Sequence, residues 1–389
     1  MKKKLLFISL LLWLSSMFLQ ACKEEDAMPD IAQKEENEEF SGGKLTTFDK
    51  SENAFGNQAT GLSSEESDFF VIGNSFFRNN WTTAPASATA RDGLGPLMNA
   101  ASCGSCHNLD GRAKPPSSVD DAALGLLFRL SSQGIAENGG PKPEPNYGLQ
   151  LNTKAVPNAE PEGIVKVSYT EIMGKYDDGT SYSLRKPNYE FSNWAYGQPT
   201  AGWLYSPRIG MQVAGLGLLE ALADNSILVN ADENDSNSDG ISGKPNYVWD
   251  AVSKSKKLGR FGWKSNQPNL FQQTAGAFLG DIGITSSLFS EENLIGKSYQ
   301  LYKDFPKGGH PEISDENLKN VTFYLQTLAV PARRNWEDNT VLRGKKLFEQ
   351  ANCGGCHTPK FQTANTHDIE NFEKPNYSSL FRLIITRYG

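Results

Sequence analysis

Two short segments of the chain share the pattern Cys-x-x-Cys-His, whose side chains are able to hold a redox cofactor. The members are Cys103, Cys106 and His107 in the first copy, and Cys353, Cys356 and His357 in the second. These pairs account for four of the five cysteines, and only four histidines occur among 389 residues. The pattern is the attachment signature of c-type haem, whose vinyl groups react with both thiols while the histidine binds the iron. The sequence therefore predicts two covalently attached haem c groups.

Cysteine pairs with this spacing also have other uses. Four cysteines in an oxidising compartment commonly form two disulfides, and two such pairs can bind a structural zinc ion. A single pair can act as a thioredoxin-like dithiol. Zinc binding does not account for a histidine after both pairs, and neither pair ends a predicted strand as a thioredoxin-like dithiol does. We therefore adopt haem attachment for both copies.

Residues 1–21 have the layout of a lipoprotein signal peptide. Three lysines precede an apolar run over residues 5–19, which is too short to span a membrane. The run ends in the letters LQAC, which resemble a bacterial lipoprotein box, where the cysteine is lipidated and becomes the new N-terminus. The alternative is an ordinary cleaved signal followed by an unrelated cysteine. We expect an exported protein, lipid-anchored at Cys22 to the bacterial membrane and facing the periplasm or the cell surface.

The residues that follow, 22–45, are rich in glutamate and aspartate and poor in apolar side chains. Such a segment buries too little surface to offset the entropy of ordering, so it is expected to be a disordered acidic tether. The whole chain has a formal net charge of -7 and a pI of about 5.3. No basic cluster follows the signal, so nucleic acid is not an expected partner.

Helices are predicted ahead of both copies. Before the second copy, residues 338–352 read DNTVLRGKKLFEQAN, in which Leu342, Leu347 and Phe348 form a partial apolar stripe at helical spacing. This segment resembles the first helix of a small cytochrome c. Ahead of the first copy, Ser63 and Glu66 form a capping-box pattern that predicts a helix start. A loop separates that helix from the first cysteine pair.

Between the two copies the pattern of side chains changes. Residues 162–186 alternate apolar and polar side chains around the turn sequence DDG, which predicts a β-hairpin. Helices are expected again over 210–223 and after Ser314, the latter ending before Pro331. We therefore expect a mainly α fold with a β-rich insertion. A first c-type haem module with the hairpin insertion would span 46–335, and a second cytochrome c-like module would span 336–389.

An acidic loop lies in the same middle region. Asp235, Asn237 and Asp239 stand at alternate positions and are followed by Gly240, as in the first half of a calcium-binding loop. The twelfth position is Asn246, where such loops carry a bidentate glutamate. The loop has two interpretations, a calcium site and a solvated Asp/Asn/Ser turn.

Five blocks of sequence carry a resemblance to a known family. They are RDGLGPLMNAASCGSCHNLDGR, SPRIGMQVAGLGLLEAL, GRFGWKSNQPNLFQQTAGAFLGDIGITSSLF, VTFYLQTLAVPARRN and LFEQANCGGCHTP. Their content and order resemble the bacterial di-haem oxidoreductase family, whose members are also labelled thiol oxidoreductase-like or di-haem peroxidases. The resemblance runs from Thr46 to Lys360. The chain is also similar, more distantly, to bacterial di-haem cytochrome c peroxidases, in which one haem stores an electron and the other meets peroxide.

The distant similarity implies three site residues. Those peroxidases carry a tryptophan between the haems, then a glutamine, then a glutamate near the iron that binds peroxide, and Trp263, Gln273 and Asp281 stand in that order here. The implied roles are an electron bridge for Trp263, orientation of peroxide for Gln273, and proton transfer between the peroxide oxygens for Asp281. The alternative is structural: a core tryptophan, a polar helix face and a turn residue.

Further ligands of the two irons are not placed by spacing. The candidates are His310, His367, Met98, Met173 and Met211. No histidine lies between His107 and His310, where the peroxidases carry the distal ligand of the first haem. The first iron would therefore be open, as peroxide chemistry requires, or bound by a methionine.

The second module is expected to be incomplete. After His357 the chain has 32 residues (389 minus 357), whereas a cytochrome c module needs on the order of 50 residues beyond its attachment site. The resembled family continues with further blocks that the last residues here do not match.

Taken together, these patterns predict an exported di-haem c-type cytochrome that acts as an oxidoreductase. It would reduce peroxide with electrons relayed between the haems, supplied by a small redox protein or a quinol-linked cytochrome. The alternative is an electron-transfer cytochrome with no substrate. Oxidation of thiols rests on the family label alone, because no cysteine remains for thiol exchange and the reaction would have to occur at a haem.

Overall fold

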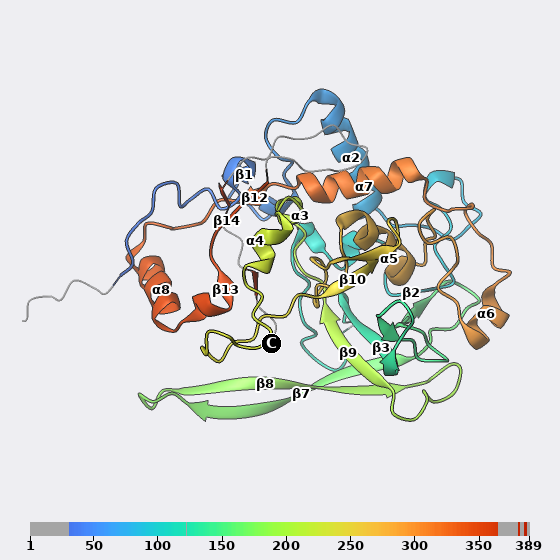
Figure 1. Cartoon of the computed structure of the whole chain (residues 1–389). Coiled ribbons are helices and arrows are strands. Elements are labelled where there is room, and N and C mark those ends of the chain that lie inside the picture. The colour runs from blue at the N-terminus through green and yellow to red at the C-terminus, as the bar shows by residue number, and fades with distance from the viewer. Residues whose placement is uncertain (1–30, 122, 365–379, 382–384, 387–389) are drawn as a thin grey trace, which may run out of the picture. The chain divides into compact units, whose positions relative to one another are not determined.

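The computed structural model describes residues 31–121, 123–364, 380–381 and 385–386 (Figure 1). The described residues fall into two compact units, one containing residues 31–39 and 333–355 and the other containing residues 40–332 and the described residues from 356 onward. The signal segment, Cys22 and His367 lie outside the described residues. Within the described part, no helix is long and apolar enough to cross a membrane.

The expectation of a mainly α fold is wrong. Helices hold 26% of the chain and strands hold 22%, distributed over several small sheets. The reason is that many strands outside the hairpin have only two residues and pair with distant segments, so they leave no alternating pattern in the sequence. The fold class is therefore mixed α and β.

Three helices build the main core of the larger unit. They are α2 (Ser64–Arg78), α5 (Leu270–Ile282) and α7 (Asp315–Thr327). Ser63, Asn269 and Ser314 cap their first turns, which confirms the predicted starts of α2 and α7. Helix α7 lies along α2 (Figure 1), and Gly73 permits this contact, because a Cβ there would lie 2.1 Å from the carbonyl oxygen of Asn320.

A sheet in the larger unit is centred on strand β3 (Leu126–Ile135). This strand pairs antiparallel with β4 (Pro141–Lys142), β5 (Gln150–Leu151) and β9 (Leu204–Ile209). One face carries Phe128, which is 2% exposed and packs on Tyr189 and Phe191. The predicted hairpin is confirmed as β7 (Ile164–Lys175) and β8 (Ser181–Ser192).

Short elements complete the larger unit. The helices are α3 (Leu216–Glu220), α4 (Asp224–Leu228) and α6 (Gly296–Tyr302), with 3-10 turns at Gly43–Leu45, Ala54–Gly56, Thr89–Arg91, Cys103–Ser105 and Asn108–Asp110. The strand pairs are β1 (Thr46–Thr47) with β12 (Val330–Pro331), β2 (Leu97–Met98) with β6 (Lys154–Ala155), β10 (Tyr247–Asp250) with β11 (Ser255–Leu258), β13 (His357–Thr358) with β16 (Ile385–Thr386), and β14 (Phe361–Gln362) with β15 (Leu380–Phe381).

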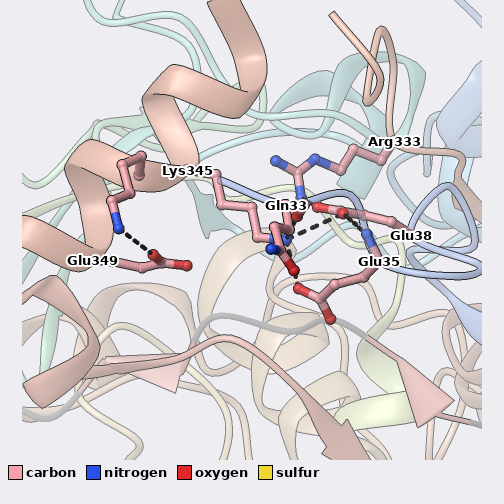
Figure 2. A network of polar contacts seen from close by, with 7 residues as sticks. Gln33, Glu35, Glu38, Arg333, Lys345 and Glu349 are labelled. Atoms are coloured by element: carbon pink, nitrogen blue, oxygen red, sulfur yellow. Dashed lines mark hydrogen bonds and ion pairs between the residues drawn. The ribbon is translucent and has the colours of Figure 1, made fainter. Parts of the chain in front are cut away.

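The smaller unit contains α8 (Asn339–Gln350), the helix predicted before the second motif. The side chain of Glu38 is fully buried and pairs with Arg333 and Lys345, and Lys345 also pairs with Glu35 (Figure 2). Buried carboxylates need such partners, because desolvation of an unpaired charge is costly. This part of the acidic segment 22–45 thus has defined contacts, unlike the tether expected from its composition, since basic side chains distant in sequence neutralise it.

A second buried carboxylate, Glu162, lies in the larger unit. It is 2% exposed, and its Oε2 accepts hydrogen bonds from the backbone N and the Nδ2 of Asn152 at 2.8 and 3.2 Å. Burial, followed by the nearby charge of Glu144, outweighs these bonds and raises the pKa of Glu162 to about 8. The folded protein therefore holds a proton on Glu162 at neutral pH.

We expect Glu162 to make the stability of the protein fall as pH rises. Between the ordinary pKa of 4.5 and the folded value of about 8, the folded state binds more protons than the unfolded state. The contribution of Glu162 to the free energy of unfolding is therefore fully present below pH 4.5 and is lost by pH 8. The slope is at most about 1.4 kcal/mol per pH unit. Glu162→Gln should flatten the free energy of unfolding measured by denaturant between pH 5 and 8. Glu160→Gln, at an exposed position, is the control and should keep the wild-type slope; equal slopes in all three proteins would contradict the assignment.

Candidate functional site

The first cysteine motif forms one tight turn. A 3-10 helix spans Cys103–Ser105, and the backbone N–H groups of Cys106 and His107 both donate to the carbonyl of Cys103, at 3.0 and 2.9 Å. The side chain of Ser102 caps the turn by accepting from the backbone N of Ser105 at 3.2 Å. Both thiols are free. The turn therefore presents two thiols and one imidazole from five consecutive residues, as covalent haem attachment requires.

The imidazole of His107 is held in one orientation by a backbone carbonyl. Its Nδ1 lies 2.6 Å from the carbonyl oxygen of Met211, so this nitrogen donates and the opposite nitrogen, Nε2, carries the lone pair. Burial lowers the pKa of His107, which favours the neutral ring. Histidines that bind metals typically donate their second ring N–H in this way. The residues of the first motif thus fit a haem with His107 as an iron ligand.

The strand that supplies Met211 also supplies the wall beside the ring. Gly210 follows β9, and a Cβ at this position would lie 3.1 Å from the carbonyl oxygen of Cys106 and 3.4 Å from Cε1 of His107. A larger residue here would press directly on the attachment turn. The glycine therefore lets the sheet approach the motif closely enough for the Met211 carbonyl to reach the imidazole.

On its other side, the motif is anchored to the helical core through Asp110. The hydroxyl of Tyr324 on α7 donates to Oδ1 of Asp110, and the Asp110 backbone N donates to the carbonyl of His107 at 2.9 Å. Burial raises the pKa of Asp110, and the Tyr324 bond opposes that rise. Phe77 on α2 packs near both groups, with ring centroids 6.0 Å from His107 and 5.4 Å from Tyr324.

Asp281, in the last turn of α5, lies close to the first motif. Its negative charge is the second cause, after burial, that raises the pKa of the Cys103 thiol to about 12 and of the Cys106 thiol to about 11. Its backbone carbonyl accepts from the backbone N of Asn99 at 2.8 Å. The carboxylate is held by Gln150 on β5, whose Nε2 lies 2.9 Å from Oδ1.

Gln150 itself is locked in place. It is 1% exposed, and its Nε2 also lies 2.6 Å from Oδ1 of Asn99 and 2.8 Å from the carbonyl of Gly280. The amide thereby connects β5 with the end of α5 and fixes the direction of the Asp281 carboxylate. The sequence pattern did not identify Gln150, because its position opposite Asp281 depends on tertiary pairing; no local motif marks it.

The other two residues implied by the peroxidase similarity lie elsewhere. The indole Nε1 of Trp263 donates to the carbonyl of Ile209 at 2.7 Å, next to the Gly210 wall of the first motif. Gln273 is in the first turn of α5, eight residues before Asp281, so the two are about 12 Å apart along the helix axis. The structure places Trp263 and Asp281 near the first motif, but it does not bring Gln273 to Asp281.

The two adjacent glutamines at the start of α5, Gln272 and Gln273, have different surroundings. The adjacent Gln272 is buried, donates to the Trp249 carbonyl and to Gln267, and accepts from the backbone N of Ala251. Gln273 is half-buried, and its Oε1 lies 3.7 Å from the position of a Cβ on Gly262. Gln272 therefore serves the fold, while Gln273 lies beside the loop that carries Trp263.

The candidates for further iron ligands differ in their surroundings. Met98 is 8% exposed and belongs to the apolar cluster on which Cys103 packs. Met211 contributes its carbonyl to the His107 side of the first motif. Met173 is 68% exposed on the hairpin, and His310 is exposed as well. Met98 is thus the buried one of the candidates in the described part of the chain, and ligation of the first iron by a methionine stays a prediction.

The second motif begins in the smaller unit and ends in the larger. Cys353–Gly355 form a 3-10 turn after α8, and His357 opens β13, which pairs with β16. Both thiols of this motif are free. The unit boundary falls between Gly355 and Cys356.

In the acidic loop, the carboxylates bind backbone groups. Oδ1 of Asp235 accepts from the backbone N of Asp239 at 3.0 Å, and both Asp235 oxygens accept from Gly240. Asn237 Nδ2 donates to Asp239. In the described residues, no group of three or more His, Cys, Asp or Glu side chains could hold a metal ion. These contacts are those of an Asx turn, and calcium binding at the loop stays a prediction.

Comparison with known families bears on the whole chain. The family model described as "Di-haem oxidoreductase, putative peroxidase" matches residues 36–376. The chain belongs to this family. The match includes both Cys-x-x-Cys-His motifs and extends past both ends of the resemblance predicted from the sequence blocks. Neither the curated proteins nor the solved structures contain a significant match to the chain. Membership indicates haem cofactors and oxidoreductase chemistry for this di-haem oxidoreductase.

Removing the Tyr324 hydroxyl tests the anchor below the first motif. In Tyr324→Phe the buried Asp110 carboxylate loses its hydrogen-bond donor, so we expect the free energy of unfolding to fall by about 1–3 kcal/mol. Tyr299→Phe, at a position 54% exposed, serves as the control and should change little. The comparison is made by denaturant unfolding of the haem-loaded proteins at pH 7. Equal unfolding free energies for the two variants would show that the Tyr324–Asp110 bond adds no stability.

Proposed function

We propose that this di-haem oxidoreductase attaches both haems through thioethers and reduces peroxide at the first motif. The observation that carries the proposal is the carboxylate of Asp281, fixed by Gln150 beside Cys103, Cys106 and His107. A carboxylate with a fixed direction next to an iron ligand is suited to move a proton during the reaction. An electron carrier has no need of such a group.

The roles of the chain's own residues follow from their positions. His107 would hold the haem iron through Nε2, because its Nδ1 is bonded to the Met211 carbonyl. The bound haem supplies the redox chemistry that reduces peroxide to water with two electrons and two protons. Asp281 accepts a proton from one peroxide oxygen and returns it to the oxygen that leaves as water. Gln150 holds Asp281 in the orientation that this transfer needs.

Electron entry is proposed to use Trp263. Its indole is bonded to Ile209, directly before the glycine that packs on His107. The guanidinium of Arg112 lies over the indole ring at 5.5 Å from its centroid, which fixes the ring by a cation–π contact. An aromatic ring in this position can pass an electron toward the first haem.

Location and partners are proposed from the N-terminal sequence. The signal over residues 1–21 and the lipidation cysteine Cys22 support export and lipid anchoring at the bacterial membrane, facing the periplasm or the cell surface. In that compartment the electron donor would be a small redox protein or a quinol-linked cytochrome. The acidic chain offers no surface composition suited to nucleic acid.

Covalent attachment is tested by mass. When the protein is produced with a cytochrome c maturation system, its mass after acid-acetone extraction should exceed that of the polypeptide by two haems. The double variant Cys103→Ser/Cys106→Ser should carry one haem, and so should Cys353→Ser/Cys356→Ser. A wild-type mass equal to that of the bare polypeptide would refute attachment through thioethers.

Peroxide reduction is tested at Asp281. Loss of a general acid/base lowers a rate by about 10²- to 10⁴-fold, while haem potentials depend mainly on axial ligands and burial. Asp281→Asn should therefore slow peroxide-dependent oxidation of a reduced donor cytochrome by that factor and keep two haems per chain. Asp304→Asn is the control, since this side chain is 83% exposed.

Two results would go against this reading. If the wild-type protein consumes peroxide no faster than free haem, it is an electron-transfer cytochrome or acts on another substrate. If the wild type is active and Asp281→Asn is equally fast, Asp281 serves only the end of helix α5.

A further inference from the structure

The sheet beside the first motif has one face with an unusual charge. Residues directly opposite each other in neighbouring strands point to the same face. The register pairs Arg129 of β3 with Ser206 of β9 and with Gln150 of β5, and it pairs Leu127 with Arg208. Arg129, Arg208 and Gln150 therefore share one face, opposite the face on which Phe128 packs.

This face looks toward the end of helix α5. Gln150 bonds the Gly280 carbonyl and Asp281, and Nη1 of Arg129 lies 4.0 Å from the position of a Cβ on Gly280. The same strand β9 continues into Gly210 and Met211, which contact Cys106 and His107. The charged face is thus continuous with the wall of the first motif.

Neither guanidinium group has an ion-pair partner in the described part of the chain, although the Asp281 carboxylate bonds Gln150 on the same face. Both arginines are half-buried. Burial, and then the charge of Arg129, lower the pKa of Arg208, so the two cations are near enough to repel each other. Oε1 of Gln150 on this face is also buried with no hydrogen-bond partner in the described structure. Half-buried like charges are costly unless an anion compensates them.

We propose that Arg129 and Arg208 form a clamp for the two propionate groups of the first haem. A haem carries two carboxylates on the edge opposite its vinyl groups, so a clamp must lie near the first motif but away from the cysteines. Arg208 is two residues before Gly210, about 7 Å along an extended strand, and Arg129 is farther along the neighbouring strand. Two guanidinium groups match two carboxylates in charge and can bind each of them through paired hydrogen bonds.

The clamp rests on the proposed haem attachment at the first motif, and it assigns a role to residues outside that motif. Loss of a cation near the iron stabilises the oxidised, more positive state. In Arg129→Gln and in Arg208→Gln the reduction equilibrium of one haem should therefore shift toward the oxidised form by about tenfold, equivalent to about 59 mV for one electron. The Lys variants at both positions keep the charge and should stay closer to the wild type.

The experiment measures both midpoint potentials of the haem-loaded protein by spectroelectrochemical titration at fixed pH, together with haem content per chain. The variant lacking Cys353 and Cys356 identifies which potential belongs to the first haem. Arg185→Gln is the matched control, because Arg185 is exposed and lies over Tyr169 on the hairpin. It should leave both potentials unchanged.

The outcomes test the propionate clamp independently of haem attachment. A lower potential of the first haem in the Gln variants supports the clamp, as does loss of that haem in the Gln variants but not in the Lys variants. Two haems with unchanged potentials in Arg129→Gln and Arg208→Gln would overturn it, and so would equal loss of haem in Gln and Lys variants. The Gln variants could keep unchanged potentials while added acetate shifts the potential of the wild type alone. That result would mean that Arg129 and Arg208 bind a free carboxylate, and it would also overturn the clamp. Failure of attachment would appear already in the wild type, as a missing haem mass.

Discussion

The hydrogen bond between His107 Nδ1 and the Met211 carbonyl joins the two parts of the molecule on which the first site depends. The cysteine turn is local, but its imidazole needs an acceptor from elsewhere in the chain to fix which nitrogen is free to face the iron. That acceptor comes from the end of β9, and it reaches the ring only because Gly210 has no side chain. The attachment turn, the sheet and the site are therefore positioned by one contact.

The same sheet also determines the chemistry around the turn. Gln150 on β5 fixes Asp281, and Arg129 and Arg208 lie on the face that Gln150 shares. A carboxylate at the end of α5 and two cations on the strands thus surround one motif from different elements. The helical core holds the opposite side through Tyr324 and Asp110. No single segment of the sequence contains the site.

This distribution explains what could be predicted from the sequence and what could not. The helix caps at Ser63 and Ser314 and the hairpin turn depend on neighbouring residues, and each of these predictions is confirmed. The cysteine spacing is equally local, and covalent haem attachment stays a prediction. The mainly α fold class was wrong because many of the strands are only two residues long and pair with distant partners, such as β2 with β6. Strands this short leave no period in the sequence.

The site residues also divide into those suggested by the sequence and those placed only by tertiary pairing. Order along the chain suggested Trp263, Gln273 and Asp281 as one group, but Gln273 and Asp281 are eight positions apart on helix α5, about 12 Å along its axis. Gln150 takes the place beside Asp281 that the linear order gave to Gln273, and strand register alone puts it there.

The buried charged groups differ in whether the chain itself compensates them. Glu38 is paired with Lys345 and Arg333, Asp110 receives the Tyr324 hydroxyl, and Glu162 keeps a proton. The cost of burial is offset within the chain by opposite charges at Glu38 and by protonation at Glu162, and in part by one hydrogen bond at Asp110, whose Oδ2 is buried without a partner in the described structure. A guanidinium cannot be neutralised as Glu162 is, because it does not lose its proton in proteins. Arg129 and Arg208 are half-buried, close enough to repel and without an ion pair in the described chain, so a further anion beside them would stabilise the pair. In a family with haem cofactors, the propionates supply two such charges at the wall of the motif that holds the first haem.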